Sequence, residues 1–461
     1  MVSEMREGNF NRVERAERVE KGLGVSSQEL GLAAKNAESA KVWPMVRLGD
    51  VCVFRRGLTY AKADEVAYSS KVVLRSNNVD LETGILNLND LKYLREDFEI
   101  PSEKIRKPNT LLMCMANGSK SHLGKVALIE QDFEYAFGGF MGLLLPKDIT
   151  PKYLYYFLKA PVFKAYVKSL QDGANINNLK FSDFSELQIP LPPIEVQKEI
   201  VERLEKELGE ADKVAAEFKR TVELADKEFK AELDEMFGGL REKGSGVGSQ
   251  ELGLAAKNAK GAKDWPMVRM GDVCEFRRGL TYAKADEVAY SSKVVLRSNN
   301  VDLESGELNL NDLKYLREDF EVPVEKIIEP NTLLMCMANG SKSHLGKVAL
   351  IEQDFKYAFG GFMGLLLPRN MNSKYLYYFL SAPLFKAYVK SLQDGANINN
   401  LKFSDFSEFQ IPLPSIEVQK EIVAKLDAAK ERCEKLKAAA ERGLTAAENL
   451  RKAILSEAFE L

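Results

Sequence analysis

The stretch SLQDGANINNLKFSDFSELQIPLPPIEVQKEI at residues 169–200 recurs as SLQDGANINNLKFSDFSEFQIPLPSIEVQKEI at residues 391–422. Each occurrence leads from a turn rich in glycine and asparagine into a long charged segment. The offset of 222 residues holds without a gap from Gln28 to Ile200, and 21 of those 173 aligned pairs differ. Because a repeat of this length is a whole domain and not one unit of a solenoid, the sequence predicts two equivalent domains, each followed by a helix.

The segment after each occurrence has the spacing of a coiled-coil helix. Its apolar residues are mostly three or four positions apart, as in a heptad pattern, which indicates a helix packed along its length on a second helix. The first copy places them at Ile200, Leu204, Leu208, Ala211, Phe218, Val222, Ala225 and Phe229. The second copy places them at Ile422, Leu426, Ala429, Cys433, Leu436, Ala440 and Leu444.

These patterns predict helices at about 194–237 and 416–459, each of about 40 residues and roughly 60 Å long. A lone helix of this kind would leave its apolar stripe in water. We therefore expect the two helices to pair antiparallel, which gives the molecule a pseudo-two-fold axis. The alternative is that each helix packs only on its own domain.

The globular part of each copy mixes strands and helices. The runs KVVLRSNNVD, GILNLNDLKYL, NTLLMCMANGS, GKVALIEQD and AFGGFMGLLLP are typical of strands bounded by turns. The run PKYLYYFLKAPVFKAYVKSLQDG has helical spacing with one proline interruption, and KFSDFSELQIPLP indicates a short helix before a strand. The predicted fold class is α+β, with two globular domains separated by two long antiparallel helices.

Composition narrows the function classes. The 461 residues carry a net charge of −3, so the chain as a whole is not a basic nucleic-acid binder, although a local basic face remains possible. Its apolar runs are too short for a membrane span and its first residues are charged, so we expect a cytoplasmic protein. Two histidines, and five cysteines without C-x-x-C spacing, make a metal site improbable.

Three loops concentrate side chains that suit nucleic acid: FRRGLTYAKAD, LRSNNVD and ANGSKSHLGK. Arginine and lysine can contact phosphate or guanine, and asparagine can pair with adenine. Each loop alone could be an ordinary solvated turn, but all three recur with the same polar residues in the second copy. The predicted DNA-binding residues are Arg55, Arg56, Tyr60, Lys62, Arg75, Asn77, Asn78, Asn117, Ser119, Lys120, His122 and Lys125, with Arg277, Arg278, Tyr282, Lys284, Arg297, Asn299, Asn300, Asn339, Ser341, Lys342, His344 and Lys347.

The repeated stretch resembles the junction between a target-recognition domain and a conserved helix in the DNA specificity subunits of type I restriction-modification systems. In that family a glycine turn precedes a short helix, a strand ending in IPLP, and a helix that opens with Glu-x-Gln. The matching residues are Gly173, Leu179, Ile189–Pro192, Glu195 and Gln197, and again Gly395, Leu401, Ile411–Pro414, Glu417 and Gln419. WPMVRLGDV also looks like the family's domain opening, so the resemblance covers nearly the whole chain from Trp43.

The resemblance implies a subunit without catalytic activity or a cofactor of its own. Such subunits bind double-stranded DNA and two modification subunits, which carry S-adenosylmethionine and methylate adenine, and restriction subunits (translocase and nuclease) can join them. Each recognition domain reads half of a split site. The two domains usually differ, whereas here they are almost identical, so we expect a palindromic site.

The resemblance also sets the expected boundaries. These are an N-terminal extension (1–42), target-recognition domain 1 (43–193), a central conserved helix (194–240), a linker (241–264), target-recognition domain 2 (265–415) and a C-terminal conserved helix (416–461).

Glu195, Gln197, Glu417 and Gln419 are candidates for contact with the modification subunits, although capping or solvated roles fit them equally well. Two other functions stay open. One is a stand-alone DNA-modifying enzyme, against which the missing cofactor and metal motifs argue. The other is a coiled-coil scaffold that binds only proteins.

Overall fold

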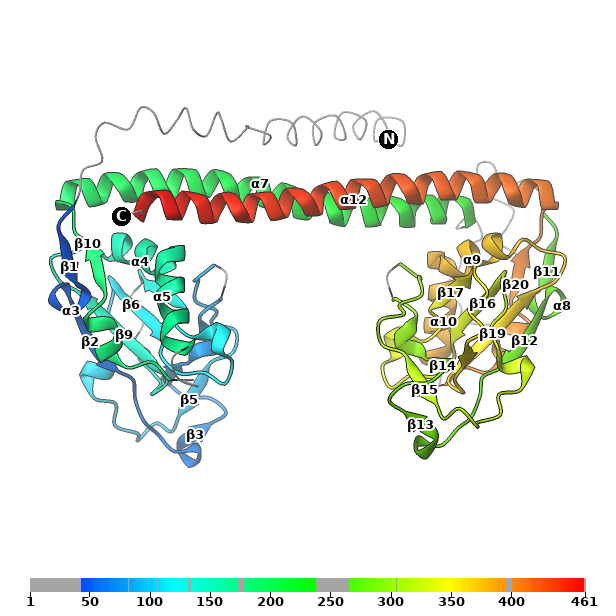
Figure 1. Cartoon of the computed structure of the whole chain (residues 1–461), viewed down its shortest axis with the longest axis horizontal. Helices are drawn as coiled ribbons and strands as arrows, with labels where there is room; N and C mark the ends of the chain where they lie inside the picture. The colour runs from blue at the N-terminus through cyan, green and yellow to red at the C-terminus, as the bar shows by residue number, and fades with distance from the viewer. Residues whose placement is uncertain are drawn as a thin grey trace. The chain divides into compact units, whose positions relative to one another are not determined.

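The structure is a computed structural model that describes residues 43–81, 83–105, 107–131, 134–172, 178–237, 265–303, 305–394 and 400–459. The predicted N-terminal extension, the predicted linker and the turns at Gly173 and Gly395 lie outside these ranges. The chain divides into two compact units. Unit 1 runs to Arg220 and resumes at Ala439, and unit 2 is Thr221–Ala438. Each unit holds one sheet-containing domain of mixed helix and strand content (Figure 1), which confirms the predicted α+β class and the two domains.

The domain of unit 1 is built on two four-stranded sheets and a two-stranded ribbon. The first sheet has the order β2-β9-β6-β7 and is antiparallel throughout. The second has the order β3-β5-β4-β8, in which β4 and β8 run parallel. The ribbon joins β1 to β10, so the start and the end of the domain are paired. The strands are β1 Met45–Arg47, β2 Cys52–Arg56, β3 Glu65–Val66, β4 Lys71–Leu74, β5 Lys92–Leu94, β6 Thr110–Cys114, β7 Val126–Ile129, β8 Ala136–Phe137, β9 Met141–Pro146 and β10 Gln188–Pro190.

Helices cover one face of the first sheet. The helix α4 (Pro151–Lys159) ends where Ala160 adopts an extended backbone, because the following Pro161 disfavours the helical region for its predecessor. The chain then starts α5 (Pro161–Asp172). The short helices α3 (Leu48–Val51) and α6 (Phe181–Ser185) flank the ribbon. This face buries the main core, which includes Leu111, Met113, Leu144, Tyr153, Leu154, Phe157, Phe163 and Phe184.

The other face of the first sheet looks away from those helices. Strand β2 shows both directions, because successive side chains of a strand point to opposite faces. Phe54 points to the helices and stacks on Phe181 of α6, with ring centroids 5.3 Å apart. Arg55 lies opposite Leu143 of β9, whose side chain belongs to a separate core with Leu74 and Phe137 of the second sheet. Arg55 is therefore on the face away from the helices.

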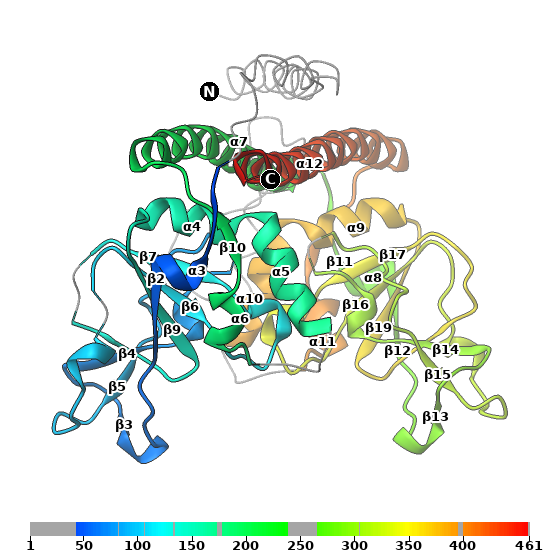
Figure 2. The same ribbon diagram turned by 60° about the vertical axis from the view of Figure 1, so that its left-hand side comes forward.

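The domain of unit 2 repeats this arrangement (Figure 2). Its strands are β11 Met267–Arg269, β12 Cys274–Arg278, β13 Glu287–Val288, β14 Lys293–Leu296, β15 Lys314–Leu316, β16 Thr332–Cys336, β17 Val348–Ile351, β18 Ala358–Phe359, β19 Met363–Pro368 and β20 Gln410–Pro412. Its helices are α8 Met270–Val273, α9 Ser373–Ser381, α10 Pro383–Asp394 and α11 Phe403–Ser407. The first sheet here has the order β12-β19-β16-β17 and the second β13-β15-β14-β18.

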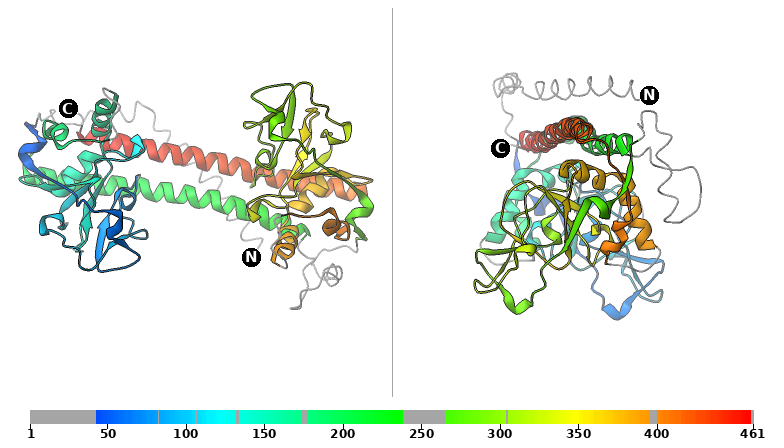
Figure 3. Two further views of the ribbon diagram at one scale, coloured as in Figure 1. Left: turned by 90° about the horizontal axis from the view of Figure 1, so that it is seen from below. Right: turned by 90° about the vertical axis from the view of Figure 1, so that its right-hand side faces the viewer.

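Two 44-residue helices complete the units: α7 (Ile194–Phe237) and α12 (Ile416–Phe459). In unit 1, Arg451 forms an ion pair with Asp212, and Phe218 packs at Gly443. The partner's number falls as the α7 number rises, so the two segments are antiparallel (Figure 3).

Unit 2 repeats the antiparallel pairing. Lys437 forms an ion pair with Asp226, and Arg432 with Glu232. In each unit, one segment of the pair follows that unit's own domain and the other belongs to the other copy's helix.

Each long helix ends on a domain core. Phe459 of α12 meets Tyr153 and Phe157 of α4 edge to face in unit 1, with ring centroids 5.4 Å apart in both cases. Phe237 of α7 meets the corresponding Tyr375 and Phe379 of α9 in unit 2. Each domain thus packs on the start of its own helix and also on the end of the other copy's helix, so the alternative that each helix packs only on its own domain is wrong.

One predicted strand is corrected. The run AFGGFMGLLLP is two strands, β8 and β9, separated by a turn at Gly138–Phe140. The turn is closed by a hydrogen bond from the Met141 amide to the Gly138 carbonyl. The two strands belong to different sheets, so the glycines allow the chain to cross between them.

Candidate nucleic-acid interface

The three predicted loops of unit 1 meet at one place. The Asn117 amide donates to the hydroxyl of Ser76 at 2.9 Å, which joins the second loop to the third. Gly57 of the first loop lies so close to the turn at 138–140 that an added Cβ would be 1.9 Å from the Gly138 carbonyl oxygen. The Phe140 carbonyl accepts hydrogen bonds from the backbone amides of Met115 and Ala116. The turn therefore links the first loop to the third.

The first loop presents its cations in different directions. Arg55 is half-buried on the sheet face away from the helices, and Arg56 is exposed at the end of β2. Tyr60 is half-buried against a small core around Val73, and burial raises the pKa of its hydroxyl. Lys62 is exposed in a short 3₁₀ turn. Arg56 and Lys62 are thus accessible to a phosphate.

The second loop divides into one exposed asparagine and one buried one. Asn77 is exposed, while Asn78 is fully buried. The Asn78 side chain accepts from the Arg75 backbone amide at 2.8 Å and donates to the carbonyls of Asn87 and Asp90, both at 2.9 Å. Its polar atoms are already used inside the domain. The prediction that Asn78 contacts DNA is therefore corrected, because this amide shapes the loop instead.

Part of the Arg75 guanidinium is also used in hydrogen bonds within the domain. Its Nη2 lies 3.0 Å from the Asp90 carboxylate and also donates to the Asp90 carbonyl. Its Nε is buried and has no hydrogen-bond partner within the described structure. Arg75 thus braces the loop that exposes Asn77.

The third loop keeps its tip exposed and buries its base. Ser119 and Lys120 are exposed, and the Ser119 amide donates to the Asn117 side chain. Lys125 is buried, and its ammonium group donates to the Val79 carbonyl at 2.8 Å. Burial lowers the pKa of this lysine, and His122 lies 3.4 Å away. The prediction that Lys125 contacts DNA is corrected on these grounds.

Unit 2 arranges its copies in the same way. Asn300 is fully buried with the same three hydrogen bonds, and Lys347 donates to the Val301 carbonyl at 2.7 Å, so both predictions are corrected as for their counterparts. Asn339 donates to Ser298, and Arg297 pairs with Asp312. The residues left exposed are Arg278, Lys284, Asn299, Ser341 and Lys342, while Arg277, Tyr282 and His344 are half-buried.

The predicted partner-binding glutamines are internal. Gln197 is fully buried, accepts from the Thr150 amide and donates to the Pro192 carbonyl, both at 2.8 Å. Gln419 makes the corresponding bonds to Asn372 and Pro414. Both therefore fix the start of the long helix to the start of α4 or α9, which corrects the prediction of a partner contact. Glu195 and Glu417 are exposed in the first turns of α7 and α12.

An aromatic residue that the sequence analysis missed stands among these loops. Phe140 is 72% exposed at the turn that links the loops, and Phe362 is 72% exposed in unit 2. Two preceding glycines and a following buried methionine are the sequence signal for an outward-facing ring. An exposed ring on a turn that joins two polar loops suits contact with bases.

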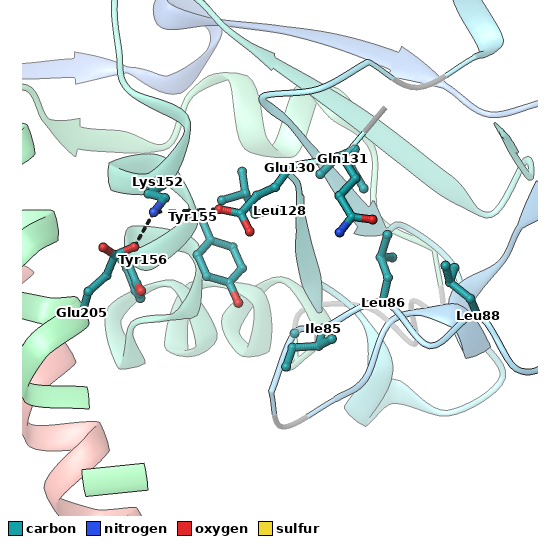
Figure 4. Close-up of a pocket in the computed structure, with 12 residues that line it drawn as sticks. Ile85, Leu86, Leu88, Leu128, Glu130, Gln131, Lys152, Tyr155, Tyr156 and Glu205 are labelled. Atoms are coloured by element: carbon teal, nitrogen blue, oxygen red, sulfur yellow. Dashed lines mark hydrogen bonds and ion pairs between the residues drawn. The ribbon is translucent and has the colours of Figure 1, made fainter. Parts of the chain in front are cut away.

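A pocket of about 330 Å³ lies on the helix side of unit 1 (Figure 4). It is lined by Ile85, Leu86 and Tyr155, and Lys152 closes one side by an ion pair with Glu205 of α7 at 2.6 Å. Unit 2 has Glu307 in place of Ile85, and this carboxylate pairs with Lys430 of α12 at 3.0 Å. The pocket therefore lies at the interface between the domain and the long helix of unit 1.

Two further searches bear on function. Among the described residues, no group of three or more histidine, cysteine or acidic side chains could hold a metal ion. No described helix is long and apolar enough to cross a membrane.

Comparison with known proteins identifies the family of both copies. The family model for the type I restriction modification DNA specificity domain matches twice, at residues 40–211 and 262–443. The EcoKI specificity subunit of Escherichia coli K12 is 26% identical over 428 residues, covering 90% of this chain and 88% of that protein. The StySPI specificity subunit of Salmonella potsdam is also 26% identical, with the same coverage.

A solved structure supports the fold. A chain from a study of complex assembly and conformational transition of the type I R-M system superposes with a TM-score of 0.68 at 18% identity. It covers 92% of this chain and 98% of that one. Two family matches across most of the chain, in the same order as the two copies, lead to one conclusion: the chain belongs to the DNA specificity subunits of type I restriction-modification systems, and its function is DNA sequence recognition.

Proposed function

We propose that this chain reads a split, nearly palindromic DNA site without catalysing any reaction itself. The recognition domains are residues 43–193 and 265–415, each of which would read one half-site. The observation that carries the proposal is the near identity of the copies, with 21 differences in 173 pairs. Equal readers of opposite orientation select a sequence and its reverse complement.

The loop residues support equal reading. All twelve predicted DNA-binding positions of the first copy have the same residue in the second. The internal hydrogen bonds that shape the loops are also repeated, such as Asn117 to Ser76 and Asn339 to Ser298. Base choice depends on which donors and acceptors reach the groove, so equal loops favour equal half-sites.

The long helices would set the gap between the half-sites. Within each unit, antiparallel ion pairs join a segment of α7 to a segment of α12. Half-sites about one DNA turn apart, roughly 34–36 Å, suit readers on one face of the duplex. The gap itself would not be read.

The partners follow from the family. Two modification subunits would bind the helices and nearby surfaces, because a two-fold molecule offers each face twice. The exposed Glu195 and Glu417 are candidate contacts. S-adenosylmethionine would be held by those subunits and not by this chain, and their adenine methylation would follow the recognised site. Restriction subunits could join the same core.

Selection from a random duplex pool tests the proposal. The chain is assembled with its modification subunits, the mass of the complex is measured by light scattering, and bound duplexes are sequenced. We expect two modification subunits per chain and a selected site whose halves are reverse complements. Binding without sequence selection would favour a scaffold, and methylation by the isolated chain would indicate an enzyme. Either result contradicts the proposal.

A further inference from the structure

The two copies differ in charge at one place beside the first loop. The first copy has Val53, Arg106 and Lys107, whereas the second has Glu275, Ile328 and Glu329. These three positions carry a net charge of +2 in the first copy and −2 in the second. Most of the other differences change size or shape. At this edge alone the two copies differ by four units of charge.

The acidic residues of unit 2 enclose Arg277. Its Nε donates to Glu275 at 2.8 Å and its Nη1 to Glu329 at 2.6 Å. Glu275 also accepts from Arg369, and these hydrogen bonds lower the pKa of its carboxyl group. Arg277 thus carries its charge within a closed ion-pair network.

The corresponding Arg55 in unit 1 has a different environment. No ion pair or hydrogen bond joins the Arg55 side chain to another described residue, since Val53 and Lys107 stand where unit 2 has the two glutamates and offer no acceptor. The backbone is the same in both units, with Arg55 opposite Leu143 and Arg277 opposite Leu365. The difference lies in the partners of the guanidinium and not in the fold.

Both arginines stand next to the candidate interface. Arg55 is on the sheet face away from α4, α5 and α7, and it precedes by two residues Gly57, which packs on the turn that carries Phe140. An unpaired guanidinium in this position can approach a phosphate next to a half-site. A paired one would have to leave two carboxylates, which would themselves repel the phosphate.

We propose that Arg55 contacts a DNA phosphate while Glu275 and Glu329 keep Arg277 from making the same contact. The two units would then read the same bases with unequal phosphate contacts. This proposal rests on the proposed function. It adds that the chain has a strong and a weak half within one symmetric target, because the loops that read bases are unchanged and only the phosphate contact differs.

Salt dependence measures this contact directly. For each neutralised phosphate, the slope of log K against log salt changes by about 0.9. The complex of this chain with its modification subunits is titrated with the selected duplex at several salt concentrations. We expect Arg55→Met to reduce the slope by about 0.9 and Glu275→Val/Glu329→Gln to increase it by about 0.9. Adding Arg277→Met to the double variant should remove that increase.

A matched control removes two negative charges elsewhere in unit 2. The variant Glu307→Gln/Glu352→Gln changes the net charge by the same amount, but on the helix side. Glu307 pairs with Lys430 there. Glu352 follows β17, the strand at the opposite edge of the sheet from β12. We expect no change in slope. Unfolding midpoints identify any variant that fails to fold, and Arg55→Lys should keep the slope if charge alone matters.

Three results separate the possibilities. An unchanged slope for Arg55→Met would overturn the inference, as would an increase in the double variant that survives Arg277→Met. Either would leave the proposed function intact, because the parent complex would still select its site. Failure of the parent complex to select any sequence would overturn both.

Discussion

Phe140 and Phe362 keep their rings in solvent although their backbones are fixed. The Phe140 carbonyl accepts from the amides of Met115 and Ala116, where the third loop begins, and the preceding glycines pack on the first loop. Because the ring is 72% exposed, it contributes little to the core. The turn therefore presents an exposed aromatic side chain next to the polar loops, where it is available for contact with bases.

We expect Phe140→Ala to weaken binding of the selected duplex by roughly tenfold, since loss of an aromatic ring stacked on a base costs about 1–3 kcal/mol. Phe362→Ala should have a similar effect because the turn is identical. The binding constant of the assembled complex is the measurement. Tyr68→Ala is the control: Tyr68 is 81% exposed, but it follows β3, at the opposite edge of the second sheet from β8. Equal binding by Phe140→Ala and the parent would exclude the ring from the interface.

Lys159 differs between the copies and is half-buried in the first. Its ammonium group donates to the Thr83 carbonyl at 2.5 Å, and burial, with Arg451 and Lys164 nearby, lowers its pKa to about 8. The second copy has Ser381 here, which donates to the Tyr377 carbonyl. The folded state thus holds a lysine that loses its proton more readily than in the unfolded chain.

This lowered pKa predicts a pH-dependent effect of Lys159→Ser. Below pH 8 both states of the parent carry the charge, and only the folded state bears the cost of burying it. Between about pH 8 and 10.4 the unfolded chain binds the extra proton, so this lysine makes the parent more stable as pH rises. We expect the difference in urea midpoint, variant minus parent, to be largest near pH 7 and to decrease toward pH 10. A difference that does not vary with pH would contradict this account.

Sequence reasoning located the loops but not the role of each side chain. Asn77 and Asn78 are adjacent and equally suited to adenine, yet one is exposed and the other supplies three internal hydrogen bonds. The same limit applied to Gln197, which fitted the family motif but is buried. Which of two neighbouring amides turns inward depends on contacts with residues distant in the chain, and spacing does not contain that information.

At the scale of elements, the two long helices pack closely at a glycine. A Cβ added at Gly443 of α12 would lie 2.4–2.5 Å from three ring atoms of Phe218 in α7. Gly209 of α7 has no atom within 4 Å of the same position. The two glycines therefore share a helical backbone but differ in what an added methyl group would meet.

The pair Gly209→Ala and Gly443→Ala tests the helix packing. We expect Gly209→Ala to stabilise the chain by about 0.5–1 kcal/mol through helix propensity. Gly443→Ala should instead destabilise it, because displacing a packed ring costs about 1–3 kcal/mol. Urea unfolding of both variants gives the comparison. Equal stabilisation by the two alanines would mean that Phe218 does not pack at Gly443.

The two long helices were predicted more accurately from the sequence than the strands were. Apolar residues mostly three or four positions apart predicted helices at 194–237 and 416–459, and α7 and α12 have these bounds. It could not indicate that Phe237 and Phe459 end on domain cores, because their partners on α9 and α4 are far away in sequence. The run AFGGFMGLLLP looked like one strand because apolarity alone does not reveal a crossing between two sheets.

At the scale of the whole molecule, the duplication allows one copy of the domain to be compared with the other in the same chain. Each unit carries the same domain, the same loop hydrogen bonds and segments of both long helices. At each position where the copies differ, the residue of one copy can be placed in the other, because the same fold already accommodates it there. Whether the two recognition domains select the same bases is therefore decided by the sequence of the two half-sites.

Sequencing of methylated adenines in cells that carry this chain with its modification subunit tests the central claim most directly. The account predicts one motif whose two halves are reverse complements, separated by a fixed gap, with a methylated adenine at the equivalent position on each strand. A motif with two unrelated halves would contradict it, because readers with identical loops would then be selecting different bases.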